Sequence, residues 1–196
     1  MERWLWQGGE GSEAVWLKLI QGHAIDVRNR VDVAIMPILT QIRLEHHITG
    51  YDLAIVVMSS GIVPPERVAL ITKGLLAGFD DDFCVALHLL VPQLEHLVRV
   101  HLQNVGAKTT TTEKGPLQME AGLSTLVLMP EMESIFGKDL TFEIRALFCD
   151  GFGPNLRNKL AHGLLHPSEF YTAASVYAWW LIFRIIYEQY WGYVEQ

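Results

Sequence analysis

The sequence predicts an all-α protein, and two observations support this class. Apolar residues recur at helical spacing along most of the chain, and no segment alternates between apolar and polar residues as a half-buried strand does. Hydrophobic residues occupy 50% of the 196 positions and charged residues 19%, so the chain can build a sizeable core. A chain of this length normally folds as one domain, and we expect a single bundle of packed helices.

The first residues are expected to lie outside the main domain. Residues 1–11 are rich in glycine, and Ser12 can cap a short helix that runs to about Gln21. We therefore divide the chain into a leader with a short helix, residues 1–24, and one helical domain, residues 25–196. The domain should begin with a longer helix from Ile25 to about Ile48, bent or loosened at Pro37.

Capping residues divide the next part of the chain into helices. Residues 49–52 have the spacing of a capping box, with aspartate in place of glutamate, and predict a short helix to about residue 59. A pair of prolines begins another helix, over residues 64–78. The aspartates at 80–82 then offer an N-cap for the helix that follows. Such a triplet can also bind a divalent cation, although capping is the commoner role at a helix start.

Residues 82–105 are the longest apolar-periodic segment before the motif described below, and they predict a core helix. Glu95 and Arg99 within it are four residues apart with the acid first, which is the favourable order for a pair along a helix. Two interpretations stay open for this pair. It either lies on a solvated surface, or one of its members reaches a neighbouring helix and orients a functional group there.

The helical pattern is interrupted once, over residues 108–120. Four consecutive threonines predict an exposed loop with a small hairpin. Short helices are expected within residues 123–135, and a stronger one over residues 139–149. Two glycines and a proline then restart the chain, so a new helix should run from about Pro154 to about Leu165, limited by Pro167.

The final helix is expected to be capped by Ser168 and to be unusually aromatic. Its most apolar run, residues 173–191, contains Arg184 and Glu188, and its uninterrupted apolar part is too short to span a bilayer. Tyrosine and tryptophan occur on more than one side of this helix. We therefore expect it to pack both against its own core and against a second partner.

Charge and cysteine content narrow the class of protein. The net charge of −7 argues against broad, unspecific binding of nucleic acid. Cys84 and Cys149 lie far apart in apolar surroundings, without the spacing of a zinc site, as in a reduced cytoplasmic protein. Glu2 and the glycines that follow do not fit a signal peptide. We expect a cytoplasmic protein with no membrane segment, no metal and no cofactor.

The segment Arg157–Gly163 gathers residues suited to a phosphodiester. Histidine titrates near neutrality and can take and give a proton, and arginine presents a planar fork of donors that matches phosphate oxygens. On a helix, Asn158 and His162 share one face, whereas Arg157 lies about 140° round from His162. Gly163 leaves room beside the histidine. The same residues can also have purely structural roles, as an ordinary ion pair and a half-buried histidine.

This motif resembles the signature of a known family. Arg-Asn-x-x-x-His-Gly is similar to the signature of a bacterial and eukaryotic family of uncharacterised domains within the HEPN superfamily (higher eukaryote and prokaryote nucleotide-binding). The resemblance covers residues 25–166. Other stretches that carry it are Val63-Pro64-Pro65-Glu66-Arg67, Lys73-Gly74-Leu75, Asp82-Phe83 through Leu89-Leu90-Val91-Pro92-Gln93-Leu94-Glu95, and Asn155-Leu156.

The resemblance implies an up-and-down helical bundle of four to five helices, with additional helices at its N-terminus. It also implies one of two functions. Many HEPN proteins are metal-independent endoribonucleases that act as dimers, with the motifs of two subunits facing each other across a cleft. Other members have no catalysis and serve as dimerisation, nucleotide-binding or partner-binding modules.

We therefore hypothesise a homodimeric endoribonuclease that cleaves RNA through attack of the 2′-hydroxyl. The catalytic residues would be Arg157, Asn158 and His162. Residues that would bind the substrate are Lys159, Gly163, Glu95 and Arg99. A toxin or defence protein neutralised by a partner protein is one setting for such an enzyme. The alternative hypothesis is a non-catalytic module that binds a nucleotide or a partner protein.

Overall fold

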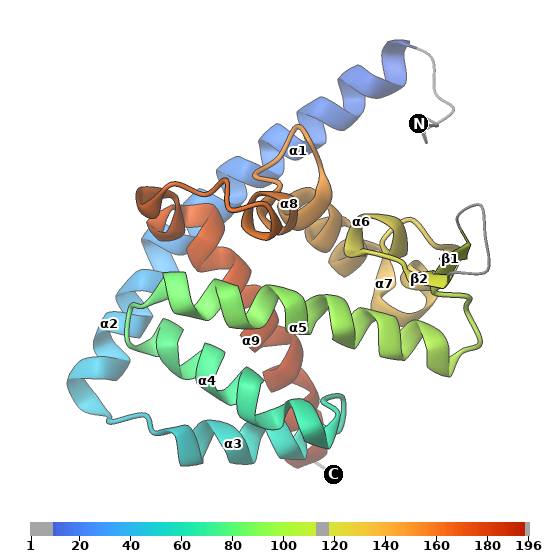
Figure 1. Ribbon diagram of the computed structural model, residues 1–196. Helices are drawn as coiled ribbons and strands as arrows, with labels where there is room; N and C mark the ends of the chain where they lie inside the picture. The colour runs from blue at the N-terminus through green and yellow to red at the C-terminus, as the bar shows by residue number, and fades with distance from the viewer. Residues whose placement is uncertain (1–9, 113–117, 195–196) are drawn as a thin grey trace.

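The computed structural model describes residues 10–112 and 118–194 and confirms the all-α class (Figure 1). The helices of its first half are α1 (Glu10–Arg30), the π-helical turn η1 (Val31–Ile35), α2 (Met36–Glu45), α3 (Gly50–Ser59), the 3-10 turn η2 (Pro65–Arg67), α4 (Val68–Phe79) and α5 (Phe83–Asn104). Those of its second half are α6 (Leu123–Leu126), α7 (Pro130–Ile144), the π-helical turn η3 (Arg145–Cys149), α8 (Leu156–Ala161), the 3-10 turn η4 (Pro167–Tyr171) and α9 (Ala173–Val194).

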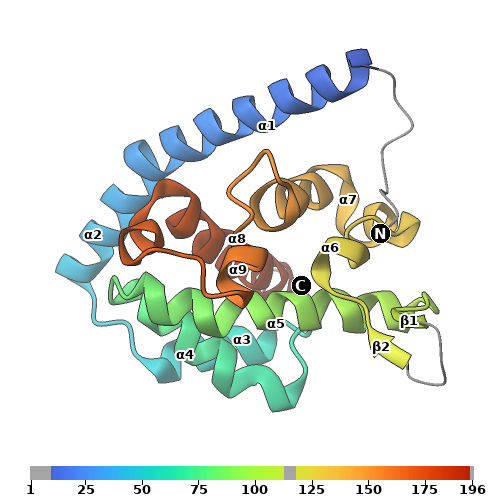
Figure 2. The same cartoon turned by 45° about the horizontal axis from the view of Figure 1, so that its top comes forward.

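Helices α5 and α9 form the centre of the bundle. In both ribbon views α3 and α4 lie on one side of α5, and α1 runs along the opposite side of the molecule (Figures 1 and 2). The predicted apolar face of α5 is buried, with Leu87 and Leu90 fully inaccessible. By length and composition alone α5 could cross a membrane, but half of its apolar window is buried inside the protein, as expected for a core helix.

The N-terminal helices differ from the prediction. No break separates residues 21 and 25, because α1 continues through them to Arg30 and is followed directly by η1 and α2. The irregularity predicted at Pro37 takes the form of the π-helical turn η1, in which the Met36 N–H donates to the carbonyl of Val31. Proline has no N–H to donate to the preceding turn of the helix. A wider π-helical turn before Pro37 therefore sacrifices no hydrogen bond from this residue.

The capping signals predicted at Thr49 and Asp82 are confirmed, whereas Ser12 lies inside α1, which begins at Glu10. The hydroxyl of Thr49 accepts from the Asp52 N–H while the Asp52 carboxylate accepts from the Thr49 N–H, which is the predicted capping box. Asp82 caps α5 by accepting from the Val85 N–H at 3.0 Å. The threonine run forms strand β1 (Thr110–Thr112), which pairs antiparallel with β2 (Gln118–Glu120).

Helix α9 is largely buried up to Ile186, as its composition predicts, whereas Tyr187 and Trp191 near its C-terminal end are 38% and 48% exposed. Trp179 is fully buried and its Nε1 donates to the Leu75 carbonyl of α4 at 3.1 Å, whereas Trp180 is half-buried beside the long N-terminal helix. Arg184 pairs with Glu143 at 2.9 Å, so the cation within this apolar helix has a carboxylate partner. The predicted cap at Ser168 is wrong: His166 caps η4, and α9 begins only at Ala173. The aromatic composition of α9 also predicts contacts with the N-terminal tryptophans Trp4 and Trp6, which lie outside the described residues.

Candidate functional site

Helix α8 carries the motif and is shorter than the sequence predicts. It begins after Asn155, whose φ of 51° is left-handed, and its first residue, Leu156, is buried in the core. It ends at Ala161 rather than near Leu165. Gly163 adopts φ +65° and donates its N–H to Leu160, while the next N–H donates to Lys159 at 2.7 Å. These two bonds form a Schellman motif, which ends a helix before any proline is reached.

Arg157 is held by a carboxylate from the central helix. Its Nε lies 2.8 Å from Oε2 of Glu95, and the same oxygen accepts the Leu123 N–H at 3.1 Å. The other Glu95 oxygen pairs with Arg99 Nη2 at 2.9 Å. Glu95 therefore joins α5, the start of α6 and α8. Of the two interpretations left open for Glu95 and Arg99, the structure supports the second, because Glu95 reaches the motif helix.

The electrostatics of this cluster favour an ionised Glu95. Burial on its own would raise the pKa of Glu95, but hydrogen bonds from Arg157 and from the Leu123 N–H outweigh it and hold the pKa below its ordinary value. Arg99 is fixed further by the Ala121 carbonyl at 2.8 Å and by Glu120 at 3.1 Å. The carboxylate and the two guanidinium groups thus form a connected network, with the side chains of both Glu95 and Arg99 largely buried.

The guanidinium of Arg157 also lies over Gly122. A β-carbon built at position 122 would come within 3.0 Å of Arg157 Nη2, so glycine provides the space for this side chain. Nη1 makes only a long contact, 3.4 Å, to Asn158 Oδ1. Arg157 is thus anchored through Nε, and its side chain keeps 27% of its surface exposed.

His162 is the C-cap residue of α8 and is exposed. Within the described residues its imidazole makes no hydrogen bond or ion pair, and Asn158 contacts Arg157 rather than His162. Lys159 is directed to the other side, where its Nζ pairs with Glu169 of η4 at 3.0 Å. The network therefore brings together Arg157, Asn158, Glu95 and Arg99, with His162 one turn away, and separates Lys159 from them.

Gly163 has a different role from the one expected. A β-carbon at this position would have no atom within 4 Å, so the glycine does not make room for a close neighbour. Its positive φ is what the backbone needs, because an L residue is strained there. Gly163 therefore sets where α8 ends, and this in turn places His162 at the helix end.

Sequence reasoning missed three neighbours of the site. Glu120 ends strand β2 and Gly122 follows the hairpin, where no helical periodicity indicates the direction of a side chain. Cys149 packs close by, and burial raises the pKa of its thiol to about 11. The thiol is therefore neutral at physiological pH and is not an activated nucleophile.

Within residues 10–112 and 118–194, no group of three or more histidine, cysteine, aspartate or glutamate side chains is arranged to hold a metal ion. Comparison with protein-family models, curated proteins and solved structures gives no match. The family resemblance of the motif therefore stays a prediction from the sequence.

Proposed function

We propose that this protein is a metal-independent endoribonuclease of the HEPN type that acts as a homodimer. The observation that carries the proposal is the anchoring of Arg157. Glu95 and Gly122 fix its guanidinium, and the Nη groups keep donor capacity for a phosphate. His162, on the same short helix, presents an imidazole to solvent. An oriented arginine fork beside an accessible histidine suits phosphodiester chemistry.

In the proposed reaction His162 removes the proton from a ribose 2′-hydroxyl. The 2′-oxygen attacks the adjacent phosphorus, and the bond from phosphorus to the 5′-oxygen breaks. The imidazolium of a second His162 gives its proton to the departing 5′-oxygen, so the products are a 2′,3′-cyclic phosphate and a free 5′-hydroxyl. Arg157 stabilises the charge that builds on the phosphate oxygens, an effect of about 2.7–4 kcal/mol per well-placed donor.

The arrangement within one chain supports a dimer. Arg157 points toward Glu95 in the interior, whereas His162 lies at the exposed end of α8. Two copies related by a two-fold axis near α8 would supply both a base and an acid around one phosphate. Light scattering at tens of micromolar should therefore give twice the mass of the chain, and a monomer would contradict this part of the proposal.

Cleavage of labelled RNA in EDTA tests the activity. Wild-type protein should cleave RNA and leave an all-deoxy analogue of the same sequence intact. His162→Ala should lose about 10²–10⁴-fold in rate. Arg157→Lys should also lose activity, because an ammonium cannot reproduce the bidentate fork. His46→Ala, which changes an exposed histidine outside the motif, is the matched control and should cleave normally.

The alternative, a non-catalytic binding module, is favoured by one specific observation. Glu95 already neutralises the charge of Arg157, and Glu169 does the same for Lys159, so the motif adds little positive charge to a chain of net charge −7. Under this alternative, wild type and all three variants would show the same background cleavage while remaining folded and dimeric. That result would overturn the ribonuclease proposal.

A further inference from the structure

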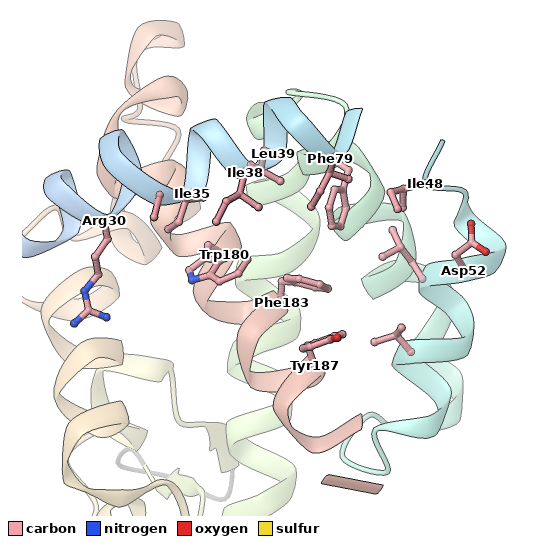
Figure 3. A pocket seen from close by; sticks show the side chains of 14 residues that line it. Arg30, Ile35, Ile38, Leu39, Ile48, Asp52, Phe79, Trp180, Phe183 and Tyr187 are labelled. Carbon is pink, nitrogen blue, oxygen red and sulfur yellow. The ribbon is translucent and has the colours of Figure 1, made fainter. Parts of the chain in front are cut away.

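An apolar pocket lies outside the α8 site, and none of the residues that line it belongs to α8. It has a volume of about 510 Å³ and opens between η1 and α2 on one side and α9 on the other (Figure 3). Residues of α3 and α4 complete its lining. This size falls within the range of roughly 300–1,000 Å³ that is typical of small-molecule sites.

One long wall of the pocket is aromatic and the other is aliphatic. Helix α9 contributes Trp180, Phe183 and Tyr187, whose neighbouring ring centroids lie 5.7 and 5.5 Å apart and form an aromatic ladder. The facing wall is aliphatic, with Ile35 and Ile38 directed toward the ladder (Figure 3). A slot between flat rings and branched aliphatic side chains fits an unbranched apolar chain.

Charged residues lie at the two ends of this slot. Figure 3 shows Arg30 at one end and Asp52 at the other. The Asp52 carboxylate is already engaged by the N–H and the hydroxyl of Thr49, at 2.9 and 2.6 Å. Arg30, by contrast, makes no hydrogen bond or ion pair with any residue that the structure describes, although its charge lies near enough to His23 and Tyr177 to lower the pKa of both. The charge available to a ligand is therefore a single guanidinium.

The backbone beside Arg30 is also irregular. The π-helical turn η1 begins at Val31, immediately after Arg30, and supplies Ala34 and Ile35 to the lining. Single π-helical turns inside helices are rare and occur frequently at functional sites. Ala34, four residues after Arg30, contributes only a methyl group to the lining.

We propose that this pocket binds a single-chain aliphatic carboxylate of the fatty-acid type. The carboxylate pairs with Arg30, whose fork matches two carboxylate oxygens. The hydrocarbon chain lies along the aromatic ladder toward Ile48. Asp52 disfavours an anion at the far end, so the ligand has one orientation. This site is separate from the proposed ribonuclease site and does not depend on it.

Titration calorimetry on the full-length protein tests the proposal. The probes are decanoate, dodecanoate and tetradecanoate, with tetradecanol as a neutral analogue and tetradecyltrimethylammonium as a cationic one. The carboxylates should bind one per chain, about fourfold more tightly for each added methylene. Tetradecanol should bind more weakly than tetradecanoate, and the cation more weakly still. Tryptophan fluorescence should change on binding, because Trp180 lines the pocket.

Two pairs of variants separate the pocket from the general surface. Arg30→Gln should weaken tetradecanoate at least about tenfold and leave tetradecanol unchanged. Arg28 is on the same helix but does not line this pocket, so Arg28→Gln should change the affinity for neither tetradecanoate nor tetradecanol. Ala34→Trp should block the slot. Val33→Trp is its matched control, because Val33 is 79% exposed and does not line the pocket.

Three outcomes would overturn the proposal. The first is no saturable binding of any carboxylate. The second is equal binding of the carboxylate and the cation with no effect of Arg30→Gln, which would indicate detergent-like adsorption. The third is conversion of a dimer to a monomer by Ala34→Trp when wild type binds no carboxylate. That result would assign the surface to a second copy of the chain.

Discussion

The Nε of Arg157 lies 2.8 Å from Oε2 of Glu95, a residue 62 positions earlier in the chain. This contact joins the motif helix to the central helix and orients the guanidinium. Because Glu95 also pairs with Arg99, loss of its charge would leave two arginines close together with no carboxylate between them. Glu95 is therefore a positioning residue in the proposed site, and its replacement should affect both stability and activity.

Glu95→Gln should lower the free energy of unfolding by about 2 kcal/mol, since each hydrogen bond to a charged group contributes roughly 1.5–3 kcal/mol. Urea denaturation at neutral pH measures this loss. Glu188→Gln is the control, because Glu188 is 63% exposed and lies 3.7 Å from its partner Arg184. It should change stability by less than about 0.5 kcal/mol. Equal effects of the two variants would contradict the role assigned to Glu95.

The pH dependence of the same contact has a definite sign. Hydrogen bonds keep the pKa of Glu95 below its ordinary value of 4.5 in the folded protein, despite burial. Its stabilisation is therefore complete above that value and is lost as pH falls through the lower, folded pKa. In acid titration followed by circular dichroism, wild type and Glu95→Gln should converge in stability. If the difference in stability between wild type and Glu95→Gln instead grew as the pH fell, the result would contradict a lowered pKa of Glu95.

Gly78 and Gly22 should respond in opposite ways to the same substitution. A β-carbon at position 78 would come 2.1 Å from Nε1 of the buried Trp179, whereas one at position 22 would meet no atom within 4 Å. Gly78→Ala should therefore destabilise the protein by about 1–3 kcal/mol or more through overpacking. Gly22→Ala, inside α1, should stabilise it by up to about 1 kcal/mol. Thermal unfolding of both variants measures the difference.

Trp179 and Trp180 are adjacent in sequence but differ in their contribution to the core. Trp179 is fully buried and hydrogen-bonded to Leu75, so Trp179→Ala should cost about 3–5 kcal/mol. Trp180 is half-buried at the pocket wall, and Trp180→Ala should cost about 1 kcal/mol. Chemical denaturation distinguishes the two. Similar losses would mean that the pocket wall is part of the rigid core.

Local features of this fold can be predicted from the sequence. The capping box at Thr49 and the Asp82 cap depend on residues three positions apart, and both were predictable. The apolar face of α5 follows from helical periodicity in the same way. Periodicity also indicated that α9 is apolar nearly all round. It could not distinguish Trp179 from Trp180, because both choices satisfy the pattern.

The site itself was only partly predictable. The pairing of Glu95 with Arg99 follows from their spacing, but the contact from Glu95 to Arg157 depends on how α5 and α8 pack. Gly122 contacts Arg157 from a segment without any periodic signal. Pro167 predicts an end of α8 near Leu165, but Gly163, with its positive φ, ends the helix at Ala161. Glycine after the last helical turn is the usual residue of a Schellman motif, and that local signal was available.

The partly buried His23 should make the stability of the protein depend on pH. His23 lies edge-on to Phe142 with ring centroids 5.4 Å apart, and its Nε2 is buried with no hydrogen-bond partner in the described residues. Burial lowers its pKa below 6.5, although Glu143 and Asp26 act in the opposite direction. The unfolded chain then binds a proton at this histidine more readily than the folded protein does. The free energy of unfolding is therefore highest above pH 6.5, and it falls as the pH drops from 6.5 toward the lower pKa of the folded protein.

His23→Phe should therefore reduce the loss of stability between about pH 7.5 and pH 5.5, while keeping the packing against Phe142. His96→Phe should further reduce this loss of stability, because the pKa of His96 is also lowered, first by burial and then by the nearby charges of Arg67 and Arg99. His46→Phe adds a phenyl ring at an exposed position and controls for the new side chain itself. Urea midpoints measured across this range give the slope for each variant. An unchanged slope in the His23→Phe, His96→Phe double variant would show that neither histidine is held neutral by the fold.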